Sequence, residues 1–441
     1  MRPAPGPRRS FFAARSPALP AAACSADERF MTVRAKAAFF LVLMLMAAAG
    51  SFSMQVFLPA LPEIQRYFGS SQSFVQLTLS LSMVAIAVST LFYGPLSDRF
   101  GRKPVLICGM SLFLAGSLLC TFAPSVTLLI VGRVAQAAGG AAGMVLSRAI
   151  VRDVYGAAEA PKAINYLTMS MVIAPMIAPV VGGFLTEGFG WRVNFAATAL
   201  LALLVGALVV GLLHETFPTA ARARSRDGSI IRSALGGLRQ VARSRRFWGY
   251  TLISAFSMAI FFAFVAGAPY LMNGLLKRPP SEYGLWFIGI PGMFAVGSFT
   301  ATRLLNTLGL DRSVMLGAML GAFVMAVAAL LYGLFALTPA LLFVPAYAIS
   351  FFQGLIIPNG VAGAINSSPG AFGAASGLVA FVQMTVSATA AQLSGTVTGD
   401  SVWPLVAIMA ACACLVLLLL PLLRSRPAVA EPAAVSPADG G

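Results

Sequence analysis

The chain alternates long apolar stretches with short polar connections. Each stretch has about 20 residues, the length that a helix needs to cross roughly 30 Å of hydrocarbon. The pattern therefore predicts an all-α protein with twelve membrane-spanning helices. We expect these helices at residues 37–58, 74–95, 104–123, 126–147, 164–186, 191–213, 247–273, 284–304, 313–335, 339–359, 371–395 and 401–423.

The composition supports this class. Charged residues make up 10% of the chain, against roughly 25% in soluble domains. A water-soluble fold needs a charged surface that this sequence cannot supply, so we expect an integral membrane protein surrounded by lipid. One histidine, His214, and five cysteines that lie mostly in apolar stretches give no basis for a metal site, a cofactor or a disulfide framework.

The net charge of +16 has a topological explanation. In a soluble protein it would suggest nucleic acid, but cytoplasmic loops of membrane proteins are enriched in Lys and Arg. With the N-terminus in the cytoplasm, about 25 of these residues lie inside. Those expected outside are Arg66, Arg192, Lys277 and Arg278. We therefore expect both termini in the cytoplasm and no nucleic-acid partner.

A basic hydrophilic stretch divides the helices six and six. Such a division predicts two six-helix bundles around a central cavity. The expected bundles span residues 36–213 and 247–423, joined by a cytoplasmic linker at 214–246. Residues 1–35 and 424–441 are expected to be disordered, and the sequence leaves open whether Met1 or Met31 is the start.

A cluster of charge interrupts the apolar pattern between the second and third helices, where residues 94–105 read GPLSDRFGRKPV. This segment resembles the loop signature of the major facilitator superfamily. The matching residues are Gly94, Asp98, Arg99, Gly101, Arg102 and Lys103.

Two further stretches resemble one branch of that family. Residues 133–155 are similar to the fourth helix of the bicyclomycin-resistance (Bcr/CflA) drug:proton antiporters. Residues 175–185, PMIAPVVGGFL, resemble the antiporter motif of the fifth helix through Pro179, Gly182 and Gly183, although Ala178 replaces the usual first glycine. The resemblance implies that these three residues form a hinge that also seals the pathway against protons. Packing alone is the alternative.

The resemblance also implies a gate at the charged loop. Asp98 would cap the start of helix eleven near Ser368–Ala371, where the helix dipole favours an anion. Arg102 would pair with Asp153 at the end of helix four. Both contacts are expected only when the cytoplasmic side is closed. The alternative is that these charges serve topology alone.

Polar residues in the apolar helices are candidates for the transport pathway. Arg133 is costly in a membrane and should face the interior, either on the pathway with Gln136 or as a buried anchor to carbonyl groups. Gln353 and Gln383 are candidates in the second half. Of nine nearby aromatic and methionine residues, we expect about a third to line the cavity. They are Phe261, Phe262, Tyr270, Met272, Tyr347, Phe351, Phe352, Phe381 and Met384.

The first helix departs from the related antiporters, which often read T-D-M-Y-L-P-A-L-P. This chain reads SMQVFLPALP, with Gln55 at the position of the acidic residue. No carboxylate then lies in the membrane core, which leaves Glu63, Glu187 and Asp98 as candidates for the proton. An uncharged cavity disfavours lipophilic cations because an unpaired cation is costly to desolvate.

These features together predict a secondary active exporter in the bacterial inner membrane. It would work by alternating access as a monomer, exchanging protons for neutral or weakly polar amphiphilic drugs. A facilitator or importer of a small metabolite is the alternative. An enzyme or channel is disfavoured by the single histidine, the absence of a buried carboxylate and the absence of a re-entrant filter sequence. The lack of a P-loop pattern disfavours transport driven by ATP.

Overall fold

The computed structural model describes residues 33–217, 241–368, 372–397 and 401–424. The expected disordered ends, 1–35 and 424–441, fall outside these ranges except at their inner edges, as does most of the linker. The first half contains α1 (Val33–Gln55), η2 (Leu58–Ala60), α2 (Leu61–Phe68), α3 (Gln72–Phe100), α4 (Arg102–Thr121), α5 (Val126–Phe189) and α6 (Arg192–Leu212).

The second half begins at the end of the linker. Its elements are α9 (Arg245–Tyr270), η3 (Leu271–Leu275), α10 (Pro280–Phe287), α11 (Gly289–Leu308), α12 (Leu310–Leu334), α13 (Pro339–Asn366), α14 (Phe372–Val397), α15 (Trp403–Leu419) and η4 (Leu420–Arg424).

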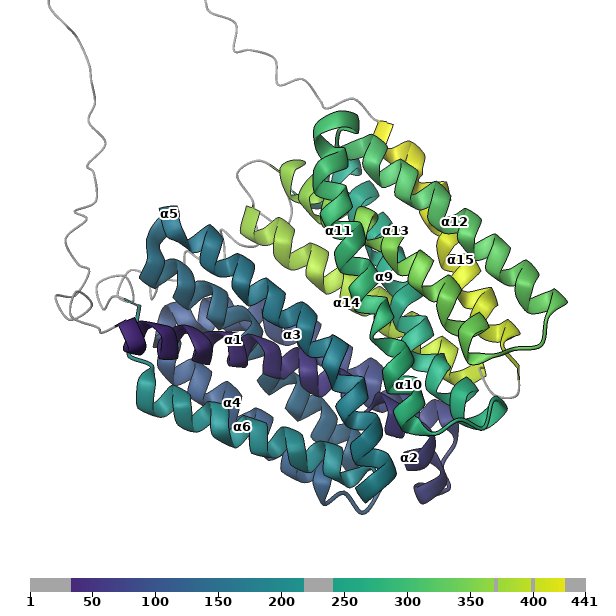
Figure 1. Ribbon diagram of the computed structural model, residues 1–441. Coiled ribbons are helices and arrows are strands. Elements are labelled where there is room, and N and C mark those ends of the chain that lie inside the picture. The colour runs from purple at the N-terminus through teal and green to yellow at the C-terminus, as the bar shows by residue number, and fades with distance from the viewer. Residues whose placement is uncertain (1–32, 218–240, 369–371, 398–400, 425–441) are drawn as a thin grey trace, which may run out of the picture.

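The described residues contain twelve helical segments long and apolar enough to cross a membrane. They form two bundles, one from each half of the chain (Figure 1). The expected all-α fold with six plus six helices is therefore confirmed. The bundles are apolar on their outer faces, where residues such as Phe184 and Leu418 are exposed to the surroundings, as a lipid environment requires.

Helices four and five run together as α5. The sequence predicted separate spans at 126–147 and 164–186, but the helical backbone continues to a reversal at Gly156, which has φ +66°. A side chain is strained in that left-handed region, so glycine allows the reversal without a longer loop. Figure 1 shows this turn at one extremity of the first bundle.

The two ends of the molecule differ in how the bundles meet. We call the end where α3 passes to α4 the loop end, and the opposite end, near α2 and α10, the closed end. In Figure 1 the bundles lie together at α2 and α10 and diverge toward the turn of α5 and the start of α14. The charged signature therefore lies at the loop end, where the bundles diverge, and the bundles are in direct contact toward the closed end.

Topology can be tested at two exposed positions, Glu159 near the loop end and Gly274 at the closed end. A cysteine at each, in a chain without native cysteines, should react differently with an impermeant thiol reagent in intact cells. Because the Lys and Arg bias places the loop end inside, we expect Gly274→Cys to be labelled and Glu159→Cys to be protected. Lysed cells should label both, and the reverse pattern in intact cells would contradict the orientation.

Candidate transport pathway and gates

A cavity of about 270 Å³ lies between the two bundles. It is lined from α1, α3 and α5 on one side and from α9, α11, α13 and α14 on the other. None of its described lining residues is charged. Its walls are largely methionine and phenylalanine: Met54, Met144, Met171, Met258, Met384, Phe261, Phe262 and Phe294. Unbranched thioether side chains adapt to different shapes, so these walls suit ligands of varied outline.

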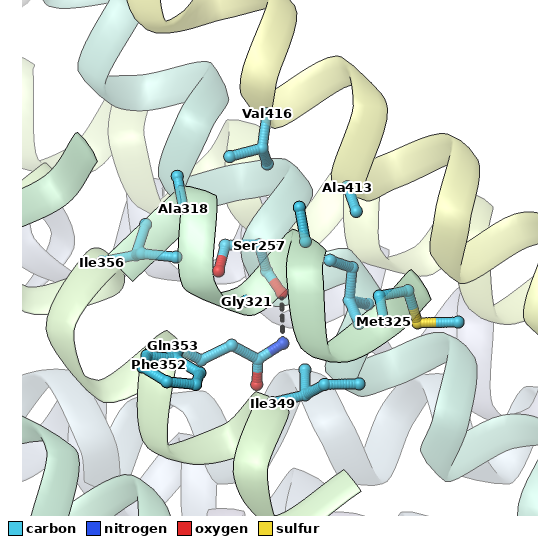
Figure 2. A pocket seen from close by; sticks show the side chains of 12 residues that line it. Ser257, Ala318, Gly321, Met325, Ile349, Phe352, Gln353, Ile356, Ala413 and Val416 are labelled. Carbon is cyan, nitrogen blue, oxygen red and sulfur yellow. Dashed lines mark hydrogen bonds between the residues drawn. The ribbon is translucent and has the colours of Figure 1, made fainter. Parts of the chain in front are cut away.

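Two amides give the cavity its main polar character, Gln55 on α1 and Gln353 on α13. Gln55 is almost fully buried, and its Oε1 has no hydrogen-bond partner within the described residues. Gln353 donates from Nε2 to the Ser257 carbonyl at 2.7 Å (Figure 2). It also lines a small void of about 20 Å³ inside the second bundle. The structure thus places two of the four candidate amides, Gln55 and Gln353, at the cavity wall.

Of the nine aromatic and methionine residues considered from the sequence, three line the cavity: Phe261, Phe262 and Met384. Others pack in the second bundle, such as Tyr270, which is buried in its core. Aromatic and methionine side chains occur both at the cavity wall and in the bundle cores. The sequence alone could therefore predict about how many of the nine line the cavity, but not which ones.

Arg133 and Gln136 are not among the residues that line the cavity. Arg133 is 1% exposed inside the first bundle, where its Nη1 donates to the Ser53 carbonyl at 3.1 Å and to the Gln136 side chain. The Phe57 ring lies 3.9 Å from the guanidinium carbon. In this conformation Arg133 is a buried anchor and not a pathway residue, because a carbonyl, an amide and a ring compensate its charge.

Gln136 extends this buried network across three helices. Its Nε2 donates to Ser117 Oγ on α4 at 2.8 Å and to Thr198 Oγ1 on α6 at 3.0 Å. Gln383 on α14 is also buried and outside the set of lining residues, and its Nε2 has no partner in the described part of the chain. The structure therefore brings Gln55 and Gln353 to the cavity but not Arg133, Gln136 or Gln383.

Arg102 is the centre of the charged loop at the loop end. Its Nη1 lies 2.6 Å from Asp98 Oδ1 and its Nε lies 2.9 Å from Asp153 Oδ2. Gly101, with φ +105°, makes the turn between α3 and α4 that places Arg102 over both carboxylates. Arg99 is exposed, and Lys103 donates from Nζ to the Val210 carbonyl of α6 at 3.0 Å.

The Arg102–Asp153 contact expected from the resemblance is present. The expectation that it forms only when the cytoplasmic side is closed was wrong. Both residues belong to the first bundle, on α4 and α5, so their contact does not depend on closure between bundles. Asp98 lies against Arg102 rather than against a helix of the second bundle. Of the expected capping segment Ser368–Ala371, the structure describes Ser368, whose buried hydroxyl has no partner among the described residues.

The closed end is held by neutral groups that cross between the bundles. Ser80 on α3 donates to Gln392 Oε1 on α14 at 2.6 Å, and Gln392 Nε2 donates to the Ser73 carbonyl at 2.8 Å. Next to them, buried Gln76 packs against Gly395, where a Cβ would collide with its side chain. Uncharged hydrogen bonds and close packing therefore hold α3 on α14.

The glycine pair of the antiporter-like motif serves two different interfaces. A Cβ at Gly182 would collide with the Val56 carbonyl, within the first bundle. A Cβ at Gly183 would lie 2.5 Å from the Pro280 carbonyl oxygen, at the start of α10 in the second bundle. Gly284 on α10 packs reciprocally against Pro179. Thus Gly183 and Pro179, but not Gly182, form the contact between bundles.

Glu63 caps a helix at the closed end. Its Oε1 accepts a hydrogen bond from the backbone N–H of Trp191, 3.3 Å away, where α6 begins. A carboxylate is stabilised at such an N-terminus, so Glu63 has a local structural partner. Glu187, the other acidic residue considered there, is exposed.

Sequence reasoning missed a charged cluster at the start of α9. Arg246 Nη2 lies 2.8 Å from Asp311 Oδ2, and the Tyr250 hydroxyl donates to the same carboxylate. Asp311 follows Gly309, which has φ +75° and occupies the turn between α11 and α12. The available signal is a partial repeat of the loop signature in the second half of the chain, in which Gly309, Asp311 and Arg312 are present.

Comparison with known proteins identifies the architecture. Residues 43–384 match the model of the Major Facilitator Superfamily, which covers more than half of the chain. The chain belongs to the major facilitator superfamily. Membership of this superfamily, together with a relative named as an MFS-type transporter, gives the chain a role in transport and not in enzymatic catalysis.

Three bacterial members of the superfamily show the range of similarity. The bicyclomycin resistance protein homolog of Haemophilus influenzae is 28% identical over 88% of this chain and 96% of its own. YdgK, an MFS-type transporter of Bacillus subtilis, is 33% identical over 68% of this chain and 75% of its own. Multidrug resistance protein D of Escherichia coli is 29% identical over 57% of this chain and 65% of its own.

Solved structures agree on the major facilitator fold. A peptide transporter POT superposes with a TM-score of 0.69 at 17% identity, covering 87% of this chain and 94% of its own. A bacterial homolog of the human lysosomal transporter Spinster, solved in an inward-facing and unoccupied conformation, gives a TM-score of 0.65 at 15% identity, covering 89% and 95%. At these identities the likeness concerns the fold.

The two glycines of the antiporter-like motif should respond differently to alanine. Gly182→Ala collides within one bundle and should lower the melting temperature of the purified protein. Gly183→Ala collides only while the closed end is shut, so it should speed labelling of a Ser80→Cys reporter at that end by roughly fivefold or more. Gly188→Ala, at an open position on the same helix, is the control for both. If both variants changed the melting temperature and the labelling rate equally, the assignment of Gly182 and Gly183 to different interfaces would be contradicted.

Proposed function

We propose that the protein is a secondary active exporter of the bacterial inner membrane that moves neutral or weakly polar amphiphilic drugs by alternating access, in exchange for protons. The multidrug and bicyclomycin resistance names of its relatives support the direction and the ligand class. It would act as a monomer, because the cavity is completed by the two bundles of one chain.

The uncharged cavity is the observation that carries this proposal. Its described lining offers two amides, Gln55 and Gln353, and two serines, Ser51 and Ser350, among apolar groups. A cation entering such a cavity would lose its hydration without gaining a carboxylate, whereas a neutral amphiphile loses little and gains apolar contact. The unpaired Oε1 of buried Gln55 favours ligands that carry a hydrogen-bond donor, once the amide turns toward them.

The Lys and Arg bias supports an orientation with the loop end and both termini in the cytoplasm. In that orientation the structure is an inward-facing state, with the closed end sealing the periplasmic side. Gly94, Asp98, Arg99, Gly101, Arg102, Lys103 and Asp153 would then form the cytoplasmic gating loop. When the cytoplasmic side closes, Asp98 would exchange Arg102 for the start of α14.

Pro179, Gly182 and Gly183 are proposed as the hinge region of the periplasmic seal. The close approach of Pro179 and Gly183 to α10 must separate when that side opens, whereas the packing of Gly182 on Val56 can persist. The seal would therefore part along the surface between α5 and α10 while the first bundle keeps its internal packing.

A facilitator is the second candidate, and the same cavity favours it. Coupling to protons needs a group that gains and loses one during the cycle, and the described cavity wall contains no carboxylate or histidine. An uncoupled carrier would need none. Asp98 remains the candidate carboxylate at the moving loop, because Glu63 is engaged as a helix cap.

Everted membrane vesicles distinguish the two functions. With a pH-sensitive dye inside, adding chloramphenicol should dissipate a preformed proton gradient if the protein is an antiporter. Uptake of the labelled drug should then exceed equilibrium and collapse with a protonophore. Vesicles without the protein are the control. Drug entry that stops at equal concentrations, with the gradient unaffected, would establish the facilitator instead.

Replacing Gln55 should change the charge preference of the cavity. Gln55→Asp introduces a carboxylate that can compensate a cation, so it should raise resistance to ethidium at least several-fold, while the wild type favours neutral drugs. Gln55→Asn, which keeps an amide, is the matched control at equal expression. A wild type that exports ethidium as well as the Asp variant would contradict the uncharged-cavity interpretation.

A further inference from the structure

The residues that follow α6 return to the start of α4. Glu215 Oε1 accepts a hydrogen bond from the Arg102 backbone N–H at 3.0 Å, and Glu215 Oε2 accepts one from Lys103 N–H at 3.3 Å. These N–H groups have no partner within their own helix, and the positive end of the dipole lies there. Glu215 is thus the cap of α4, supplied from 112 and 113 residues away.

The same carboxylate shapes the segment that carries Phe217. Glu215 Oε1 also accepts from the Phe217 backbone N–H at 3.0 Å. The resulting turn places the Phe217 ring 4.6 Å from the guanidinium carbon of Arg102. A cation over an aromatic face is stabilised by the ring quadrupole, more strongly where water is excluded. With an Arg102 side chain that is 8% exposed, Phe217 completes an enclosure whose other sides are Asp98, Asp153 and the Ser97 hydroxyl.

The far end of the linker has an equivalent attachment. Arg246 contacts Asp311 directly after the turn at Gly309, in the second bundle, as Glu215 contacts Arg102 directly after the turn at Gly101, in the first. Both ends of the 214–246 segment are therefore fastened to the corresponding loops of the two bundles. An attachment that recurs at matching places indicates a role in the movement of those loops.

Asp98 is the less buried of the two carboxylates on Arg102, with its side chain 39% exposed against 18% for Asp153. It is therefore the one that can leave. If Asp98 leaves, Arg102 stays buried and must keep enough compensation from its remaining neighbours. Those neighbours are Asp153, the Phe217 ring and the Ser97 hydroxyl, which accepts a hydrogen bond from Arg102 Nη1. The Glu215 cap holds both the ring and the backbone in place.

We propose that Glu215 and Phe217 are positioning residues of the gating loop. They hold Arg102 against Asp153 and compensate its charge, so that Asp98 is free to move between Arg102 and the second bundle. Without the ring, Arg102 depends more on Asp98, and the protein remains in the conformation seen here. The inference rests on alternating access but not on any substrate or on proton coupling.

The test follows opening of the closed end without substrate. In a chain without native cysteines, Ser80→Cys reports opening through its rate of labelling by an impermeant thiol reagent. Phe217→Leu, which keeps apolar volume but removes the ring, should slow labelling by about threefold or more. Phe217→Tyr, which keeps the ring, should restore the rate. Glu215→Gln, which weakens the cap, should slow labelling in the same direction.

A double-mutant cycle separates positioning from ordinary stability. If Phe217 acts through the release of Asp98, Phe217→Leu should have no further effect in an Asp98→Asn background. A merely structural contact would slow or speed labelling equally in both backgrounds, and that result would overturn the proposal. So would an unchanged rate in Phe217→Leu alone. Failure of drug export in the vesicle assay would leave these rates interpretable, because labelling requires no drug.

Discussion

An ionised side chain at the centre of a membrane costs about 2.5–3.5 kcal/mol on insertion scales, and the arrangement of this protein follows from avoiding that cost. Its charged groups gather at the ends of the helices, around Arg102 and Arg246 at the loop end. Among the described residues the exception is Arg133, which a carbonyl, an amide and a ring enclose inside the first bundle. The same cost applies to the cavity between the bundles, and its described lining is uncharged.

The same constraint explains why the two ends are held by different chemistry. The closed end is formed by amide and hydroxyl hydrogen bonds such as Ser80–Gln392, together with backbone approach at Gly183 and Gly284. Neutral contacts need no counter-charge when they separate. The loop end, near water, can use ion pairs because a parted carboxylate is rehydrated there. A protein built this way can open either side without stranding a charge in an apolar setting.

The sequence predicted the helices well because a helix-length apolar run has few alternatives in a membrane. It predicted the contact between Arg102 and Asp153 through a resemblance, but it wrongly made that contact depend on closure of the cytoplasmic side. It could not assign Gly182 and Gly183 to different interfaces, since neighbouring residues on a helix differ only in direction.

Two other residues show the same limit of sequence reasoning. The sequence left Arg133 open between the pathway and a buried anchor, because the cost of burying a charge does not show whether it faces the bundle interior or the cavity. Glu215 was visible as one of few acidic residues in a basic linker, but its partner on α4 depends on tertiary packing. Sequence patterns indicated which residues are unusual, and the fold determined what each one contacts.

The neutrality of the cavity has an electrical consequence. Moving one elementary charge across 100 mV of membrane potential changes the free energy by about 2.3 kcal/mol. If the bundles rock around a neutral ligand, as proposed, the loaded cavity with its uncharged lining carries no charge from one side to the other. The voltage then exerts no direct force on that step, and its rate is set by packing at the closed end and by the ion pairs at the loop end.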